Sequence, residues 1–341
     1  MLFLNQTKQS RGGKFFFESD FIHEHVLASF RKAGSFLFWD SALNASVHLL
    51  RKALPAVVHL ETRIDPNHRS AAILGTERAG TGVVLTSCGG LILTAYYLLI
   101  GADRVQVQCP DGRRVEGRVF GIDYASGLGI VAPEESGLDA LSLSPGGLAQ
   151  RGSEAFVVAS VGEERRVASG FVTSTSPFDA LWEFALDPAI YFSAPNPGLG
   201  GGPLLDRQGG VLGIAALSMA HAGRPTVVFP GAGSLAMIDA IERDGVYRTP
   251  QSQGWLGMTC LMVGNHLAVA GIFPESPAAA GGLIPGDSIL LLQGHAVANR
   301  IDLYQRLRAE RPGAALRFRV RRGGEVVELS IEAGAVETYF A

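Results

Sequence analysis

The feature that most constrains the fold of this chain is a long succession of short apolar runs separated by glycine-rich turns. Runs rich in valine, leucine and isoleucine recur at residues 56–62, 80–85, 91–94, 104–108, 114–123, 128–132, 155–160, 166–174, 189–194, 211–217 and 226–230. Many short strands joined by turns are typical of β-sandwiches and β-barrels, and the 43 glycines of the chain suit such turns. The sequence therefore predicts a mainly β body.

The size and charge of the chain exclude several classes of protein. At 341 residues it is longer than one ordinary domain, and an apolar fraction of 47% with a charged fraction of 18% suits a folded chain with a sizeable core. A formal net charge of −3 gives no electrostatic reason to bind nucleic acid or an anionic membrane surface. The apolar segment 33–50 contains Asp40, Asn44 and His48, which argues against a transmembrane helix.

Residues 1–54 form a separate extension that is rich in aromatic side chains. Apolar residues three and four apart, such as Leu43, Val47 and Leu50, predict helix between about residue 19 and residue 54, ending before Pro55. Two roles stay open for the aromatic side chains, which either pack on the body of the same chain or form an interface between subunits. The first 20 residues carry five charged side chains and no long apolar run, which predicts no secretory signal peptide.

A glycine-rich stretch, Asn196–Asp206, carries the first functional signal. Residues 198–203 read Gly-Leu-Gly-Gly-Gly-Pro and are followed by two leucines. Glycine and proline by themselves predict only a loop. The stretch also resembles the Gly-x-Ser-Gly-Gly-Pro loop that carries the nucleophile of trypsin-like serine proteases, and in this alignment Gly200 takes the place of the serine.

Two further motifs extend this resemblance to the HtrA (DegP/DegQ-like) family of serine proteases. Residues 90–102 resemble the family's Gly-x-Ile-Leu-Thr-Asn-x-His-Val-Val-x-Gly-Ala motif, with Tyr97 in the place of the catalytic histidine. Residues 121–131 resemble its Gly-x-Asp-x-x-x-Asp-Leu-Ala-Val-Leu motif, with Gly127 in the place of the catalytic aspartate. The resemblance implies a trypsin-like pair of six-stranded β-barrels with the site between them. Each motif keeps its framework and lacks its reacting residue.

The last part of the chain resembles the PDZ domain that follows HtrA proteases. Trp255, Leu256, Gly257 and Met258 match the loop that binds a peptide carboxylate, and the Ser-Pro-Ala and Pro-Gly-Asp motifs follow at residues 276–278 and 285–287. The predicted divisions are an aromatic-rich helical extension at 1–54, a degenerate protease domain at 55–240, a linker at 241–253, a PDZ domain at 254–335 and a tail at 336–341.

The three substituted positions decide the predicted chemistry. A serine protease triad needs a nucleophile, a base and an orienting carboxylate, and Tyr97, Gly127 and Gly200 supply none of these at neutral pH. Backbone N–H groups near Gly198 and Gly200 are candidates for a remaining oxyanion hole. The sequence therefore predicts a pseudoprotease rather than an enzyme.

An alternative is an active serine endopeptidase with a relocated triad. Ser193 and Ser218 flank the site region, and His59 and His221 are candidate bases, but the three groups have to meet within hydrogen-bond reach. No metal site is expected, because the pair His23 and His25 and the scattered His48, His59 and His68 match no zinc spacing. No cofactor is expected either. The three cysteines predict ordinary thiols, and a Cys88–Cys109 disulfide stays open.

The predicted function is binding. A PDZ domain adds an extended peptide to a sheet edge and holds its terminal carboxylate with loop N–H groups, so protein or peptide C-termini and hydrophobic segments are the expected partners. The chain is expected to act as a scaffold, regulator or chaperone-like subunit of a homo- or hetero-oligomer, for example with an active HtrA-type protease. A second alternative is a structural subunit that docks into a larger complex through residues 1–54. The predicted location is cytoplasmic, and the family resemblance implies a periplasmic or other extracytoplasmic alternative.

Overall fold

The computed structural model describes residues 46–86, 89–135, 137–145, 149–219, 225–245, 247 and 253–341. Most of the predicted extension, residues 1–45, lies outside this set, as does the His23 and His25 pair. Residues 46–53 are helical, and the chain continues into a single 3-10 turn, η1 (Leu54–Ala56), that includes Pro55. Leu49–Ala341 form one compact unit.

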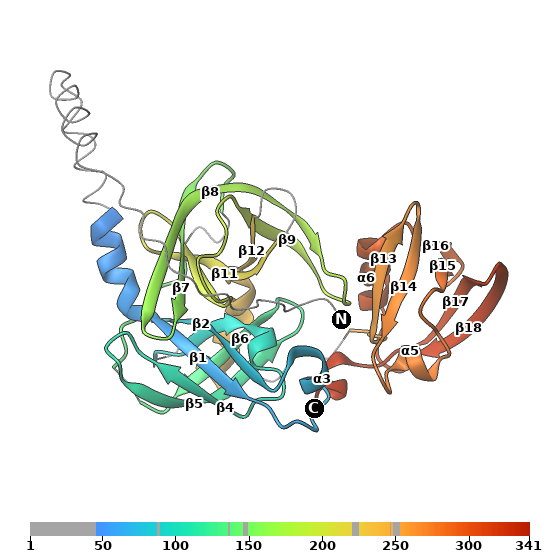
Figure 1. The fold of residues 1–341 in the computed structure, drawn as a ribbon, viewed down its shortest axis with the longest axis horizontal. Coiled ribbons are helices and arrows are strands. Elements are labelled where there is room, and N and C mark those ends of the chain that lie inside the picture. Colours follow the sequence, from blue (N-terminus) through green and yellow to red (C-terminus); the bar gives the residue numbers. More distant parts are fainter. Residues whose placement is uncertain are drawn as a thin grey trace, which may run out of the picture. The chain divides into compact units, whose positions relative to one another are not determined.

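The first half of this unit is a closed β-barrel in the strand order β1-β2-β3-β6-β5-β4 (Figure 1). Its strands are β1 (Val57–Arg63), β2 (Glu77–Val84), β3 (Ile92–Ala95), β4 (Arg104–Gln108), β5 (Arg114–Asp123) and β6 (Leu128–Pro133). Two short helical segments, α3 (Ala71–Leu74) and η3 (Tyr96–Leu98), interrupt it. Its interior is filled by buried aliphatic side chains such as Leu60, Ile92 and Val131.

The second half is a second closed barrel in the order β10-β11-β12-β9-β8-β7. Its strands are β7 (Glu154–Val161), β8 (Glu164–Asp179), β9 (Ala185–Phe192), β10 (Gly202–Leu205), β11 (Val211–Ser218) and β12 (Thr226–Pro230). The predicted mainly β fold with two six-stranded barrels is thus confirmed. Two differences stand out: the glycine-rich stretch contains the buried strand β10, and β8 and β9 extend beyond the predicted 166–174 and 189–194 into a long hairpin.

A short helical region follows the second barrel. It consists of the turn η4 (Gly231–Ser234) and the helix α4 (Leu235–Asp244), which buries Met237, Ile238 and Ile241. The helix ends at Asp244, within the predicted linker 241–253, because Gly245 adopts a left-handed conformation at φ 70° and caps it.

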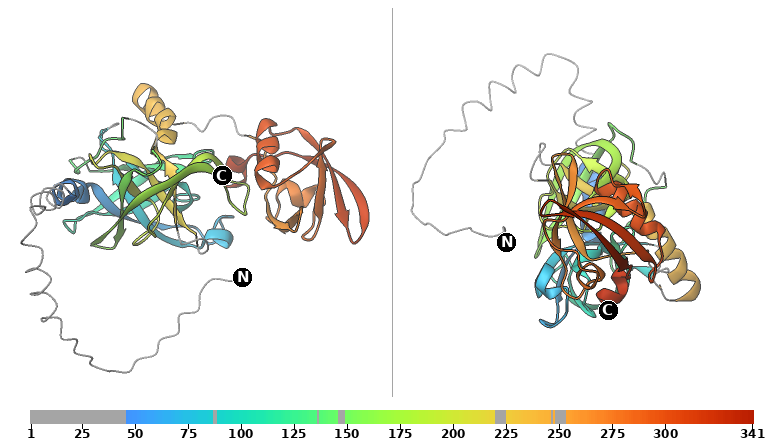
Figure 2. Two further views of the ribbon diagram at one scale, coloured as in Figure 1. Left: turned by 90° about the horizontal axis from the view of Figure 1, so that it is seen from above. Right: turned by 90° about the vertical axis from the view of Figure 1, so that its right-hand side faces the viewer.

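The C-terminal part contains a sheet in the order β13-β14-β15-β17-β18, with β16 paired to β15 (Figure 2). Its elements are β13 (Met258–Val263), β14 (His266–Ile272), α5 (Pro277–Ala280), β15 (Ser288–Leu292), β16 (His295–Ala296), α6 (Arg300–Ala309), β17 (Ala315–Arg322), β18 (Glu325–Glu332) and α7 (Val336–Tyr339). Leu303 and Leu307 of α6 are buried in the core of this domain. β13 is an edge strand of the sheet.

Several further observations concern cysteines, metal ligands, membrane spans and the C-terminal residues. Cys109 and Cys260 are buried free thiols, while Cys88 lies outside the described residues. The histidine, cysteine and acidic side chains of the described residues form no cluster suited to a metal ion. No helix in the described ranges is long and apolar enough to cross a membrane. The C-terminal aromatic residues pack on their own chain, where the Tyr339 ring lies 4.8 Å from that of Trp255.

Candidate functional site

Tyr97 lies in η3, directly after β3, where the resemblance places the catalytic histidine. Its hydroxyl group donates a hydrogen bond of 2.8 Å to the carbonyl oxygen of Ala216 in β11. Burial raises the pKa of Tyr97 far above its ordinary value. The phenol is therefore a protonated donor at neutral pH and does not serve as a general base.

Gly200 faces the Tyr97 hydroxyl group. A Cβ atom at Gly200 would overlap with the Tyr97 hydroxyl oxygen and would lie 2.9 Å from the carbonyl oxygen of Ala216. The phenol thus fills the space that a side chain at position 200 requires. The loop itself is firmly held, because the Gly200 carbonyl accepts from the Thr81 N–H at 2.8 Å and the Thr81 hydroxyl donates to the Leu199 carbonyl at 3.0 Å.

Gly127 is likewise enclosed. It has a φ of 74°, which favours glycine, and a Cβ atom would lie 2.7 Å from the rings of Phe184 and Phe229. Its carbonyl accepts a 3.0 Å hydrogen bond from the Tyr96 N–H. The structure therefore brings Tyr97 and Gly200 into contact and places Gly127 against the neighbouring Tyr96. An aspartate at position 127 would need the two aromatic rings to move.

The candidate oxyanion hole is not assembled at Gly198. Its N–H donates to the side-chain oxygen of Asn196 at 3.2 Å, within the same loop. The neighbouring Gly201, at φ 97°, donates its N–H to the Ala215 carbonyl at 2.7 Å. Both amides are thus committed to holding the loop rather than to a ligand.

Three of the four residues weighed for a relocated triad lie in the described ranges, and these three form no contact with one another. The Ser193 hydroxyl accepts from the Phe171 N–H at 2.9 Å, and Ser218 ends β11 as an exposed residue. His59 is buried in β1, where its Nε2 lies 3.5 Å from a carboxylate oxygen of Glu61. His221 lies outside the described residues.

A serine–imidazole contact that the sequence did not suggest joins Ser70 and His68 at 2.8 Å. Ser70 is fully buried, and its hydroxyl group donates to the Ile100 carbonyl and accepts from the Arg78 guanidinium. A substrate carbonyl has no access to this hydroxyl group. The pair therefore serves the packing of the 64–76 segment.

The predicted peptide-binding loop contacts a carboxylate of the same chain. The N–H groups of Leu256 and Gly257 both donate to one carboxylate oxygen of Glu183, each at 2.9 Å. Gly257 has a φ of 80°, and a Cβ atom there would overlap with Ser276. Glycine is thus required for this geometry. Trp255 and Met258 flank the loop, Trp255 packing on the Phe273 ring and Met258 beginning β13.

Sequence reasoning missed Glu183, which lies between β8 and β9, 73 and 74 positions from its two partners. Burial raises the pKa of the Glu183 carboxyl to about 7, although the two N–H groups and the nearby Arg308 oppose that rise. One of its oxygens, Oε1, is buried without a hydrogen-bond partner among the described residues. A carboxylate in such a place is poised to change its charge near neutral pH.

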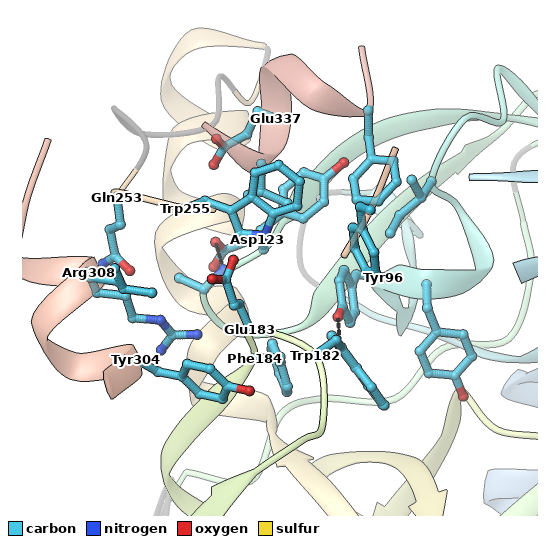
Figure 3. A pocket seen from close by; sticks show the side chains of 18 of the residues that line it. Tyr96, Asp123, Trp182, Glu183, Phe184, Gln253, Trp255, Tyr304, Arg308 and Glu337 are labelled. Atoms are coloured by element: carbon cyan, nitrogen blue, oxygen red, sulfur yellow. Dashed lines mark hydrogen bonds between the residues drawn. The ribbon is translucent and has the colours of Figure 1, made fainter. Parts of the chain in front are cut away.

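A cavity of about 450 Å³ adjoins this contact (Figure 3). Its walls contain several aromatic side chains and come from both barrels, the 253–255 segment, α6 and the C-terminal residues; they include Tyr96, Tyr97, Trp182, Trp255 and Arg308. Tyr97, one of the three candidate triad positions, and Trp255 of the predicted peptide-binding loop therefore line the same cavity.

Comparisons with known proteins support this organisation. Residues 80–214 match the family model "Trypsin-like peptidase domain", and residues 254–333 match the model "PDZ domain". The chain is 27% identical over 275 residues to a probable periplasmic serine endoprotease, DegP-like, of Halomonas elongata, covering 75% of this chain and 56% of that one. It is 27% identical over 277 residues to the putative serine protease HhoB of Synechocystis, covering 75% and 66%. The chain thus spans a little over half the length of the first of these relatives.

Solved structures show the same fold. An HtrA-type protease, AlgW with a tripeptide, aligns with a TM-score of 0.51 and 25% identity over 84% of this chain and 96% of that one. A serine endoprotease from Yersinia pestis aligns with a TM-score of 0.53 and 22% identity over 84% and 97%.

These comparisons correct one prediction and weaken another. The expectation that the chain is not an enzyme is contradicted, because the relatives are named serine endoproteases and point to an enzyme family. The names also favour the periplasmic alternative over the predicted cytoplasmic location. The chain thus contains a trypsin-like peptidase domain followed by a PDZ domain, and its fold is similar to that of HtrA-type proteases.

Proposed function

We propose that this chain recognises extended peptides or protein C-termini through the groove of its PDZ domain. The observation that carries this proposal is the pair of N–H groups at Leu256 and Gly257, which converge on a single carboxylate oxygen at 2.9 Å each. Loop N–H groups that converge in this way are how PDZ domains hold a terminal carboxylate.

The groove has the other parts that peptide binding needs. β13 is the edge strand of its sheet, which is the position where a further strand can add. α6 forms the opposite wall and contacts β13. In this proposal Trp255, Leu256, Gly257 and Met258 form the carboxylate-binding loop, and the PDZ unit comprises residues 254–335, joined by the linker 241–253 to the barrels at 55–240.

A glycine substitution in the loop tests this function. We expect Gly257→Ala to weaken binding at least tenfold, because the new methyl group collides with Ser276 and turns the N–H groups away. The probe is a fluorescein-labelled peptide with the sequence of residues 178–183 and a free terminal carboxylate, followed by fluorescence anisotropy at pH 7.5. Gly264→Ala is the matched control, since Gly264 also has a positive φ, 59°, but lies in open space in the β13–β14 turn. Equal binding by both variants contradicts the proposal.

The names of the relatives favour a second candidate function, hydrolysis of peptide bonds. In our proposal Tyr97, Gly127 and Gly200 occupy the positions of the relatives' triad, so a hydrolytic activity of this chain uses other groups. Turnover of unfolded casein by the purified chain tests this candidate. Activity that co-elutes with the protein and is lost in a Ser193→Ala or Ser218→Ala variant supports a relocated nucleophile; activity that separates from the protein opposes it.

The remaining proposals concern the cellular location of the protein and its partners. We propose a periplasmic location, in line with the names of the relatives, and an oligomer that presents the PDZ groove as a scaffold or chaperone-like subunit. Residues 1–54 are the proposed docking segment for an active HtrA-type protease or another larger complex. Size-exclusion chromatography with light scattering on the full chain and on a chain lacking residues 1–54 tests this role. If the segment mediates assembly, the larger oligomer should form only with the full chain.

A further inference from the structure

The PDZ groove in this structure contains a segment of the same chain. Residues Ala180–Phe184 form the tip of the hairpin between β8 and β9, and they lie along the free edge of β13. Trp182 pairs with Thr259 in an antiparallel bridge, and the Cys260 N–H donates to the Leu181 carbonyl at 2.9 Å. The tip therefore adds to the sheet as a peptide ligand does.

The direction of the hairpin tip places a carboxylate at the loop. Because Leu181 lies opposite Cys260 and Trp182 opposite Thr259, the next residue, Glu183, reaches Leu256 and Gly257. A peptide would end here with its own carboxylate. This chain instead turns sharply, with the Phe184 N–H donating to the Trp182 carbonyl at 2.5 Å, and the Glu183 side chain provides the carboxylate.

The opposite wall of the groove holds the tip from the other side. Three residues of α6, spaced four apart on one face, contact the hairpin; Figure 3 shows two of them, Tyr304 and Arg308. Arg300 forms an ion pair with Asp179, Tyr304 donates to the Ala180 and Leu181 carbonyls at 3.1 and 3.0 Å, and Arg308 donates to the Ala185 carbonyl at 2.8 Å. β13, α6 and the carboxylate-binding loop thus all form hydrogen bonds with this one segment.

The far side of the tip is anchored in the barrels. Phe184 is buried, and its ring stacks on that of Tyr96 at 5.4 Å and lies tilted against that of Phe229 at 5.1 Å, measured between ring centroids. The indole N–H of Trp182 donates to the Tyr96 hydroxyl at 3.1 Å. Tyr96 precedes Tyr97, whose hydroxyl group fills the space beside Gly200. The hairpin tip in the PDZ groove thus directly contacts Tyr96, the residue next to the candidate triad position Tyr97.

We propose that the hairpin tip Ala180–Phe184 is an internal ligand of the PDZ groove, and that an extended peptide with a terminal carboxylate binds by displacing it. This inference rests on the proposed function of the groove. A site that is free only in a fraction of molecules shows an apparent Kd raised by the inverse of that fraction. The docked tip therefore sets the affinity of the groove for every peptide of this class.

Glu183→Ala in the full chain tests the inference. The labelled peptide of residues 178–183 is titrated at pH 6.0, and we expect the variant to bind it at least tenfold more tightly than the native chain, because the tip loses its carboxylate anchor. Glu164→Ala is the matched control: it removes an exposed carboxylate from the other end of β8, where Glu164 pairs with Arg166, and should bind like the native chain.

Amide hydrogen exchange provides a second measurement that does not depend on the probe. We expect the amide of Cys260 to exchange faster in Glu183→Ala than in the native chain, while amides of the β17–β18 pair stay protected. Equal peptide affinity for native chain and variant, with saturable binding in both, overturns the internal-ligand inference and leaves the proposed function in place. Failure of the probe to bind any of these proteins overturns the proposed function, and the inference with it.

Discussion

The hydroxyl group of Tyr97 and the missing side chain of Gly200 are complementary. Because a Cβ atom at Gly200 overlaps with that hydroxyl oxygen, we expect Gly200→Ala to lower the free energy of unfolding by about 1–3 kcal/mol, the usual cost of overpacking. Tyr97→Phe removes the overlapping atom, so Gly200→Ala should cost less in that background. Urea unfolding of the two single variants and the double variant measures the difference.

The coupling between the two sites is the decisive quantity. Residues in contact show interaction energies of about 0.5–3 kcal/mol in a double-mutant cycle. Some cost of Gly200→Ala remains in the double variant, because the Ala216 carbonyl also lies close. Pairing Gly200→Ala with Tyr191→Phe, on β9, is the control and should give additive effects. Additive effects for the Tyr97 pair as well would show that the phenol does not fill the space of the missing side chain.

At the scale of elements, α6 holds the hairpin tip with one residue per turn. Tyr304→Phe removes the donor to the Ala180 and Leu181 carbonyls. The Leu181 carbonyl keeps the Cys260 N–H, but leaving the buried Ala180 carbonyl unpaired costs about 1–3 kcal/mol. We expect that loss in the free energy of unfolding by urea. Tyr191→Phe is the matched control, since its hydroxyl group donates to the exposed Pro177 carbonyl and its loss should cost under about 0.5 kcal/mol. Equal losses would mean that the Tyr304 contact is not structural.

The elements also show which parts of the fold and of the site can be predicted from the sequence. Short apolar runs separated by turns predicted a mainly β body, and the resemblance to HtrA proteases implied its two six-stranded barrels. β10 was missed because its residues Gly202–Leu205 belong to a glycine-rich stretch whose burial depends on the pairing with β7 and β11. Glu183 was missed for a similar reason. The local sequence Leu-Trp-Glu-Phe contains no signal for a carboxylate partner, because its partners lie in the PDZ domain and are brought to it only by the fold.

At the scale of the whole molecule, the docked tip makes peptide binding depend on pH. The pKa of Glu183 is raised to about 7 when the tip is docked, against an ordinary value of about 4.3. Docking is therefore most favourable at low pH and weakens as the pH rises from about 4.5 to about 7, because ionising a buried carboxyl is costly. Arg308 opposes this effect, while Tyr304 and Cys260, which also face Glu183, have pKa values raised by burial and stay neutral.

The expected outcome is that the native chain binds the labelled peptide more tightly at pH 7.5 than at pH 5.5, by roughly fivefold or more. Glu183→Gln carries a neutral side chain of the same shape, so its tip stays docked and its weak binding should not change with pH. Glu183→Ala should bind tightly at both pH values. Anisotropy titrations of the three proteins separate the effect from titration of the peptide, which is common to all. A pH dependence that persists unchanged in Glu183→Gln would assign it to another group, since the carboxyl of Glu183 is then not the one that titrates.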